Sequence, residues 1–210
     1  MKAGVVAGIV AALLTAPLPA PPQDLRQSQT SAANAERIES GSVLSADGQP
    51  VAYRIRLLPV SSFPDLPGAV AAELNRRGCM IPQSFEAKQP ENVIHGAFRA
   101  AGSSDWAALC SSQQTTTLYV FFAGQAESPI ALRSQPDSAW LGTEPGGSVF
   151  GSAWGIADRS VAELRSTPAI RRGLTIDHDA IDDARLERSL AIHYFEAGRW
   201  VNLRPDDAGA

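Results

Sequence analysis

The residues best suited to chemistry cluster in the segment TIDHDAIDD, residues 175–183. Carboxylates at this density are typical calcium ligands, and a histidine among aspartates suits a transition metal. The EF-hand spacing fails, because the twelfth residue of a loop that starts at Asp177 is Arg188 rather than glutamate. We therefore assign no metal and no cofactor. The cluster consists of Asp177, His178, Asp179, Asp182 and Asp183, of which Asp177, Asp179 and Asp182 are kept as weak metal candidates.

An acidic helix N-terminus explains the same segment without a ligand. The helix dipole favours aspartates at that position. Leu186 and Leu190 follow four residues apart, which is the spacing of one helix face. We expect a helix to begin in this cluster.

Two histidines supply an alternative function. His178 or His193, with a nearby Asp or a bound metal, has the chemistry of a hydrolase general base near neutral pH. A histidine in a strand is more commonly a half-buried neutral side chain, and the alternation around His193 indicates a strand. The segment GSAWG, residues 151–155, places its serine one position too early for the G-x-S-x-G elbow of a serine hydrolase. No catalytic residue is assigned.

Two tryptophans lie near the ends of the glycine-rich segment GTEPGGSVFGSAWG, residues 142–155. The segment lacks the lysine of a phosphate-binding P-loop, so a flexible loop is its simplest interpretation. Trp140 and Trp154 are either core residues or exposed anchors, since tryptophan is prominent both in cores and in binding surfaces. We take this pair as the candidate ligand-binding residues.

The segment GAFRAAGSSDWA, residues 96–107, resembles the calcium loop of FG-GAP/VCBS-type repeats. The positions that match the pattern are Gly96, Phe98, Gly102, Asp105 and Ala107. Alternating positions where the family places oxygen ligands hold Ala97, Arg99 and Ala101, so the resemblance implies the loop shape without its ion. The segments RGCMIPQ, ENVIHGAF, DWAALC and HYFEAGRWVNL also resemble secreted bacterial proteins of unassigned function, a resemblance that implies no activity.

The N-terminus is typical of an exported protein. Lys2 precedes an apolar run of fourteen residues, AGVVAGIVAALLTA, which is short for a membrane-spanning helix. We expect residues 1–20 to be a signal peptide, with an uncleaved anchor as the alternative, and a periplasmic or secreted location. In such an oxidising compartment Cys79 and Cys110 are expected to form a disulfide, with two buried free thiols as the alternative.

The composition narrows the range of partners. Of the 210 residues, 44% are hydrophobic and 19% charged, which is typical of a globular protein. The formal net charge is -4 and the basic residues are scattered, so no basic stripe is available to bind nucleic acid. We expect a protein or cell-envelope ligand, no nucleic acid, and no membrane span in the mature form.

Short elements must position these residues. Residues 21–41, rich in Pro, Gln, Ser and Ala, are expected to be a flexible linker, and residues 42–207 a single globular domain. Alternating apolar residues predict a strand over 51–57. Apolar residues four apart predict a helix that is capped by Asp65 and ends at Gly78.

The second half of the domain is expected to hold fewer regular elements. The pattern predicts strands over 106–110 and 115–122, a loop-rich stretch over 124–155, a short helix over 156–165, and a hairpin of 189–195 with 200–203. Two strand pairs with one clear helix predict an α+β fold. Its expected form is a small antiparallel sheet built from hairpins, with one or two helices and one disulfide.

These features together favour an exported, non-catalytic domain that binds a protein or an envelope ligand. The hydrolase based on His178 or His193 is the alternative hypothesis. A small inhibitor of an external hydrolase is a third.

Overall fold

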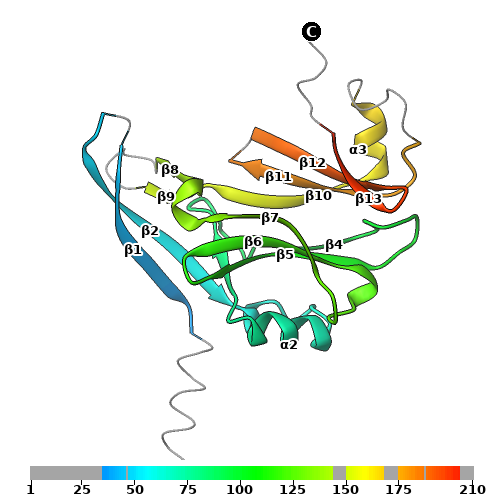
Figure 1. Ribbon diagram of the computed structural model, residues 1–210, viewed down its shortest axis with the longest axis horizontal. Helices are drawn as coiled ribbons and strands as arrows, with labels where there is room; N and C mark the ends of the chain where they lie inside the picture. The colour runs from blue at the N-terminus through cyan, green and yellow to red at the C-terminus, as the bar shows by residue number, and fades with distance from the viewer. Residues whose placement is uncertain (1–34, 46, 144–149, 168–174, 187, 204–210) are drawn as a thin grey trace, which may run out of the picture. The chain divides into compact units, whose positions relative to one another are not determined.

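The computed structural model describes residues 35–45, 47–143, 150–167, 175–186 and 188–203 (Figure 1). The expected signal peptide, residues 1–20, lies outside the described residues, as does the expected linker up to residue 34. The first strand begins at Arg37, so the end of the stretch expected to be a linker is part of a sheet.

The described residues form two sheets, one of nine strands and one of four. The larger sheet contains β1 (Arg37–Leu44), β2 (Pro50–Pro59), β3 (Met80–Gln83), β4 (Val93–Gly96), β5 (Asp105–Ser112), β6 (Thr115–Phe121), β7 (Ile130–Pro136), β8 (Leu141–Thr143) and β9 (Phe150–Ser152). The smaller sheet contains β10 (Trp154–Arg159), β11 (Ala180–Arg185), β12 (Arg188–Glu196) and β13 (Arg199–Leu203). The helices are α2 (Gly68–Arg76) and α3 (Val161–Ser166), with 3-10 turns η1 (Val60–Ser62), η2 (Phe122–Gly124) and η3 (Asp137–Trp140).

The strand order of the larger sheet is β7-β6-β5-β3-β2-β9-β8, with β1 paired to β2 and β4 paired to β5. The smaller sheet runs β10-β11-β12-β13. Strands β2 and β9 pair in parallel, whereas the other strand pairs of the described residues are antiparallel. The larger sheet is therefore mixed.

The predicted α+β fold with a small sheet is wrong, because the molecule is mostly β. The stretch 124–155, predicted to be loop-rich, contains β7, β8 and β9. The acidic cluster starts no helix, since β11 begins at Ala180. Residues 156–165 are divided between β10 and α3. The predicted hairpins 106–110 with 115–122 and 189–195 with 200–203 are confirmed as β5–β6 and β12–β13.

Alternating side chains on the strands give each sheet two apolar faces. On β5, Ala107 and Leu109 pack with residues of the smaller sheet, whereas Ala108 and Cys110 pack with α2. On β11, Ile181 contributes to the cluster between the sheets, while the preceding residue packs on the α3 side. Because successive strand residues point to opposite faces, the order of layers is α2, larger sheet, smaller sheet, α3.

Helix α2 ends as the sequence predicts. The backbone N–H of Cys79 donates to Leu74 O and that of Gly78 to Asn75 O, which together form a Schellman motif. Gly78 adopts a positive φ of 71°, the conformation this motif requires. At the other end of the helix Pro67, not Asp65, holds the N-cap position.

The predicted disulfide is confirmed and joins Cys79, just after α2, to Cys110 on β5, with a Cα–Cα distance of 4.9 Å. In the chain-entropy account a loop of this length destabilises the unfolded chain by about 3.7 kcal/mol. The bridge therefore fixes α2 on its sheet. Within the ranges given above, no helix is long and apolar enough to cross a membrane.

Asn92 joins the two sheets through hydrogen bonds to the backbone. Its side-chain Nδ2 donates to Pro82 O of β3 at 2.6 Å and to Trp154 O of β10 at 3.3 Å. Its Oδ1 accepts from the backbone N–H of Ile156 at 2.9 Å. Asn92 is 1% exposed and has a φ of 71°, a conformation that asparagine adopts more readily than most residues. One side chain thus satisfies backbone groups of both sheets.

We expect Asn92→Ala to lower the free energy of unfolding by about 2–4 kcal/mol, because three buried hydrogen bonds are lost and alanine is strained at a positive φ. Urea unfolding monitored by fluorescence measures the change. Asn92→Gly tolerates this φ and separates the two causes. Asn75→Ala, on the exposed side of α2, is the control and should stay within about 0.5 kcal/mol of wild type. If Asn92→Ala lowers the free energy of unfolding no more than Asn75→Ala does, Asn92 does not join the two sheets as described.

Candidate functional site

Trp140 and Trp154, the candidate ligand-binding residues, lie in the core between the sheets. Trp140 comes from η3 and is 5% exposed, and Trp154 comes from β10 and is 1% exposed. Their rings stack with centroids 4.0 Å apart. The interpretation of these tryptophans as exposed anchors is therefore wrong, and the alternative of core residues holds.

Asp183, fully buried on β11, is the polar centre of this core. Its carboxylate accepts hydrogen bonds from Trp154 Nε1 at 2.6 Å and Arg133 Nη1 at 2.9 Å, and His193 Nε2 lies 3.4 Å away. The guanidinium of Arg133 also lies over the ring of Trp140, 4.2 Å from its centroid. Burial opposes the negative charge, but the hydrogen bonds from His193, Arg133 and Trp154 hold the pKa of the Asp183 carboxyl below its usual range.

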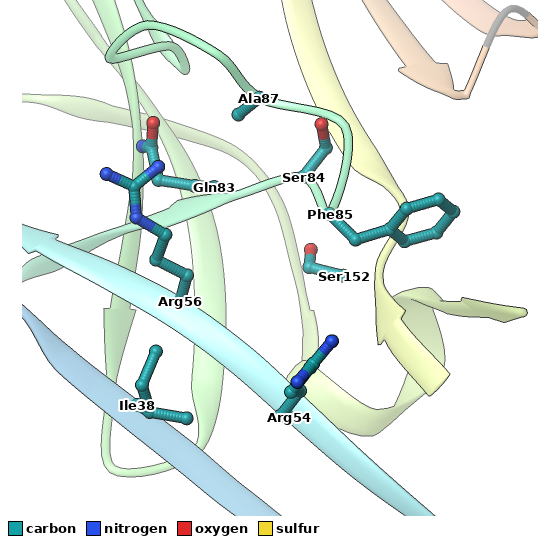
Figure 2. Close-up of a pocket in the computed structure, with 8 residues that line it drawn as sticks. All are labelled: Ile38, Arg54, Arg56, Gln83, Ser84, Phe85, Ala87 and Ser152. Carbon is teal, nitrogen blue, oxygen red and sulfur yellow. The ribbon is translucent and has the colours of Figure 1, made fainter. Parts of the chain in front are cut away.

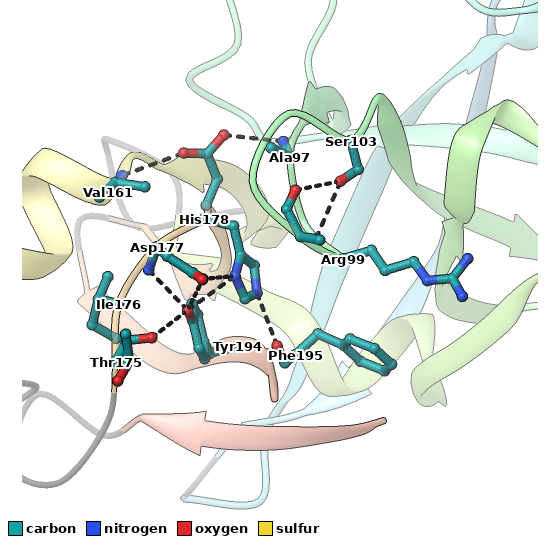
Figure 3. Close-up of polar contacts among 12 residues, drawn as sticks. Ala97, Arg99, Ser103, Val161, Thr175, Ile176, Asp177, His178, Tyr194 and Phe195 are labelled. Atoms are coloured by element: carbon teal, nitrogen blue, oxygen red, sulfur yellow. Dashed lines mark hydrogen bonds and ion pairs between the residues drawn. The ribbon is translucent and has the colours of Figure 1, made fainter. Parts of the chain in front are cut away.

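His178 lies in a second polar cluster, which Figure 3 shows. Its Nε2 is 2.8 Å from the backbone oxygen of Phe195, and its Nδ1 is 2.6 Å from Asp177 Oδ1 and 3.0 Å from the Tyr194 hydroxyl. The Tyr194 hydroxyl in turn donates to the backbone oxygen of Thr175 at 3.1 Å. The hydrogen bonds from His178 and Tyr194 hold the pKa of the Asp177 carboxyl below its usual range.

The geometry of His178 suits a structural role better than proton transfer. Both ring nitrogens are bonded within the protein, and the side chain is 7% exposed. Asp177, His178 and Tyr194 line a hollow of about 350 Å³, together with Arg99 and Glu196. A general base needs a nitrogen within reach of its substrate, and here each nitrogen already has a partner. The cluster fastens the segment before β11 to the end of β12.

The three aspartates kept as metal candidates have separate partners. Asp179 accepts from the backbone N–H groups of Ala97 at 3.0 Å and Val161 at 3.3 Å, so it connects the loop after β4 to the start of α3. Asp182 accepts from Arg159 Nε at 2.8 Å. Over the part of the chain that the structure describes, no group of three metal-ligating side chains is present.

Asp105 organises the loop between β4 and β5, the segment that resembles a calcium loop. Its Oδ2 accepts from the backbone N–H of Arg99 at 2.8 Å and from the Ser103 hydroxyl. Its Oδ1 accepts from the backbone N–H of Ala123 at 2.8 Å. The carboxylate is fully buried, and its partners are donors of the chain itself.

A third feature is a hollow of about 370 Å³ between the β1–β2 hairpin and the segment that follows β3 (Figure 2). Arg54 and Arg56 both reach into it from the same face of β2, as their spacing of two residues requires. Ile38 of β1 lies directly across from Arg56. The facing side is formed by Gln83, Ser84, Phe85, Ala87 and Ser152.

The facing wall of the hollow is held by the side chains of Gln83 and Glu91, each of which bonds to the backbone near the other. Gln83 Nε2 donates to Glu91 O, and Gln83 Oε1 accepts from the Glu91 N–H, both at 2.9 Å. The Glu91 carboxylate accepts from the Ser84 N–H at 2.6 Å. The Phe85 N–H donates to the backbone oxygen of Ser152 at 3.0 Å. These bonds close the loop of residues 84–91 at its base and tie it to β9.

The local sequence pattern does not predict this hollow. Arg54 and Arg56 fall at polar positions of the strand predicted over 51–57. Two cations at i and i+2 on one strand face are a visible pattern, but the wall opposite them comes from β3, β9 and a loop that the local pattern does not bring near. Ser152, rejected as a nucleophile on its spacing, is 3% exposed and lines the hollow.

The search for relatives gives no support for any family. No protein-family model, curated protein or solved structure matches this chain.

We expect Trp154→Phe to lower the free energy of unfolding by about 1.5–3 kcal/mol more than Trp140→Phe does. Both changes remove similar ring atoms from one stack, but only Trp154 Nε1 donates to the charged Asp183. Trp140 Nε1 is buried without a hydrogen-bond partner among the described residues, which makes Trp140→Phe a matched control. Urea unfolding at pH 7 measures both, and equal losses would contradict the role of Asp183.

The pH dependence gives the same comparison a second readout. Because the folded-state pKa of Asp183 is lowered, its contribution to stability is present above the ordinary Asp pKa of about 3.9 and is lost as the pH falls through the lower folded value. Trp154→Phe removes one of the bonds that lower this pKa. Its acid unfolding should therefore begin at a higher pH than that of Trp140→Phe.

Proposed function

We propose that this chain is an exported, non-catalytic domain that binds a protein or cell-envelope ligand in the hollow between the β1–β2 hairpin and residues 83–87. The observation that carries the proposal is the convergence of two arginines from β2 on one concave site. Charged groups that converge on a concave site with apolar neighbours are typical of ligand sites. Ile38 and Phe85 supply those apolar neighbours.

The disulfide supports an extracellular setting for this function. A Cys79–Cys110 bridge is compatible with an oxidising compartment such as the periplasm or the medium. The proposed export still depends on the N-terminal residues, which lie outside the described structure. No nucleic acid is proposed as a partner, because the chain carries a net charge of -4.

The hydrolase hypothesis has one observation in its favour, the close pair of His178 and Asp177 beside a hollow. Against it, the second nitrogen of His178 is bonded to a backbone carbonyl, and His193 Nε2 faces the buried Asp183. A hydrolase would lose turnover of ester, peptide or glycoside substrates in His178→Asn or His193→Asn. We expect no turnover in wild type to lose.

The binding site is tested by filling it. A panel of acidic, basic and neutral peptides and of envelope saccharides is screened by thermal shift. A true ligand at 100 times its Kd stabilises by about 2.7 kcal/mol, which for a domain of this size raises Tm by roughly 5–10 °C. We expect Ala87→Trp, which occupies the hollow, to abolish that rise.

Ala162→Trp, on the exposed side of α3, is the control and should keep the full rise in Tm. Both variants are first compared with wild type by urea unfolding to show that they are folded. If every stabilising ligand works equally well on Ala87→Trp and on the control, the hollow is not the binding site.

A further inference from the structure

Arg56, which lines the hollow, already holds the carboxylate of Glu36, which does not line it. Arg56 Nε donates to Glu36 Oε1 at 2.9 Å, and Arg56 Nη2 donates to Glu36 Oε2 at 3.3 Å. This is the bidentate fork by which a guanidinium recognises a carboxylate group. The fork shows that Arg56 is oriented for an anion with two parallel oxygens.

The Glu36 carboxylate is exchangeable. The side chains of Arg56 and Glu36 are 38% and 47% exposed, so solvent screens their attraction. Exposed ion pairs contribute little, at most about a fivefold change in an equilibrium. A ligand that brings its own carboxylate and additional contacts in the hollow can therefore displace Glu36.

The residues around Arg56 suit an extended peptide that carries an acidic and an aliphatic side chain two residues apart. Glu36 directly precedes β1 and lies two residues before Ile38, and its carboxylate accepts from Arg56 on the neighbouring strand. Ile38 lies opposite Arg56 in the β1–β2 register and lines the hollow with Phe85. An acidic side chain next to an aliphatic one would therefore have both a cation and apolar surface to contact.

We infer that the hollow binds an acidic segment of a peptide, whose carboxylate takes the place of Glu36 on Arg56, and that Glu36 is an internal competitor. The inference rests on the proposed function, because it names the ligand class of the same site. Arg54 lines the hollow too and adds positive charge to it. The Glu91 carboxylate, which accepts from the Ser84 N–H, does not line the hollow.

The test is a titration of the purified chain with two blocked peptides, GEAIG and its neutral counterpart GQAIG, monitored by NMR chemical shifts. We expect Glu36→Gln to bind GEAIG about two- to fivefold more tightly than wild type, since an exposed internal competitor is removed. Arg56→Gln should bind it at least about twofold more weakly than wild type, because the charge-assisted hydrogen bond to the ligand is stronger than the exposed Glu36 pair that it replaces. GQAIG should bind weakly to all variants, with no gain in Glu36→Gln.

Two controls match these changes in charge. Glu127→Gln removes the same charge from an exposed position that does not line the hollow, and Arg199→Gln does so for a cation on β13. Both should bind GEAIG as wild type does. Equal affinities in Glu36→Gln and Glu127→Gln would overturn the role of Glu36.

A third arm uses inorganic phosphate as competitor. Phosphate that binds as tightly as GEAIG and displaces it completely would overturn the peptide assignment in favour of a small-anion site. A further outcome is that GEAIG fails to bind while other ligands of the thermal-shift panel raise the Tm of wild type but not of Ala87→Trp. That result overturns the acidic peptide as the ligand class and leaves the proposed binding function in place. If no ligand depends on residue 87, the proposed function falls as well.

Discussion

The contact between the two sheets depends on hydrogen bonds and an ion pair to the buried carboxylate of Asp183. Asp183 is fully buried, and an isolated buried charge costs several kcal/mol. Its cationic partner, Arg133, lies on β7 of the larger sheet, whereas Asp183 belongs to β11 of the smaller one. The pair therefore fixes the position of β7 relative to β11 where the two sheets pack together. Trp154 donates to the buried Asp183, and Trp140 stacks on Trp154 and packs against the guanidinium of Arg133, whose side chain is 30% exposed.

Elements whose bonds are local could be predicted from the sequence. The end of α2 at Gly78 follows from a glycine that supplies a positive φ one residue past the helix. The hairpin β12–β13 follows from alternation on both sides of the turn at Ala197 and Gly198, where both residues have positive φ, as a two-residue turn of the primed type requires. The disulfide followed from the expected compartment and not from geometry.

Elements whose bonds are distant in sequence could not be predicted. Strand β11 has the sequence AIDDAR, and two adjacent aspartates are depleted in strands because a buried carboxylate needs a partner. Here Asp182 pairs with Arg159 and Asp183 with Arg133, residues 23 and 50 positions away. When the distant arginines are not known, the same sequence predicts the N-terminus of a helix at the surface. The choice between core and exposed anchor could not be made for Trp140 and Trp154 for the same reason, because their neighbours come from both sheets.

One stretch of chain contributes both to the hollow and to the hydrogen bonds by which Asn92 joins the two sheets. Gln83, Ser84, Phe85 and Ala87 line the hollow, and Asn92, a few residues further along the chain, is bonded to β3 and β10. A loop held at one end by Gln83 and at the other by Asn92 is preorganised, so a ligand orders little of it on binding. The opposite side carries Arg56 in an exposed ion pair that water already competes for. The ligand that we propose would replace one side chain of an exchangeable pair instead of rearranging a strand. The buried hydrogen bonds of Asn92 would then support the site without contacting the ligand.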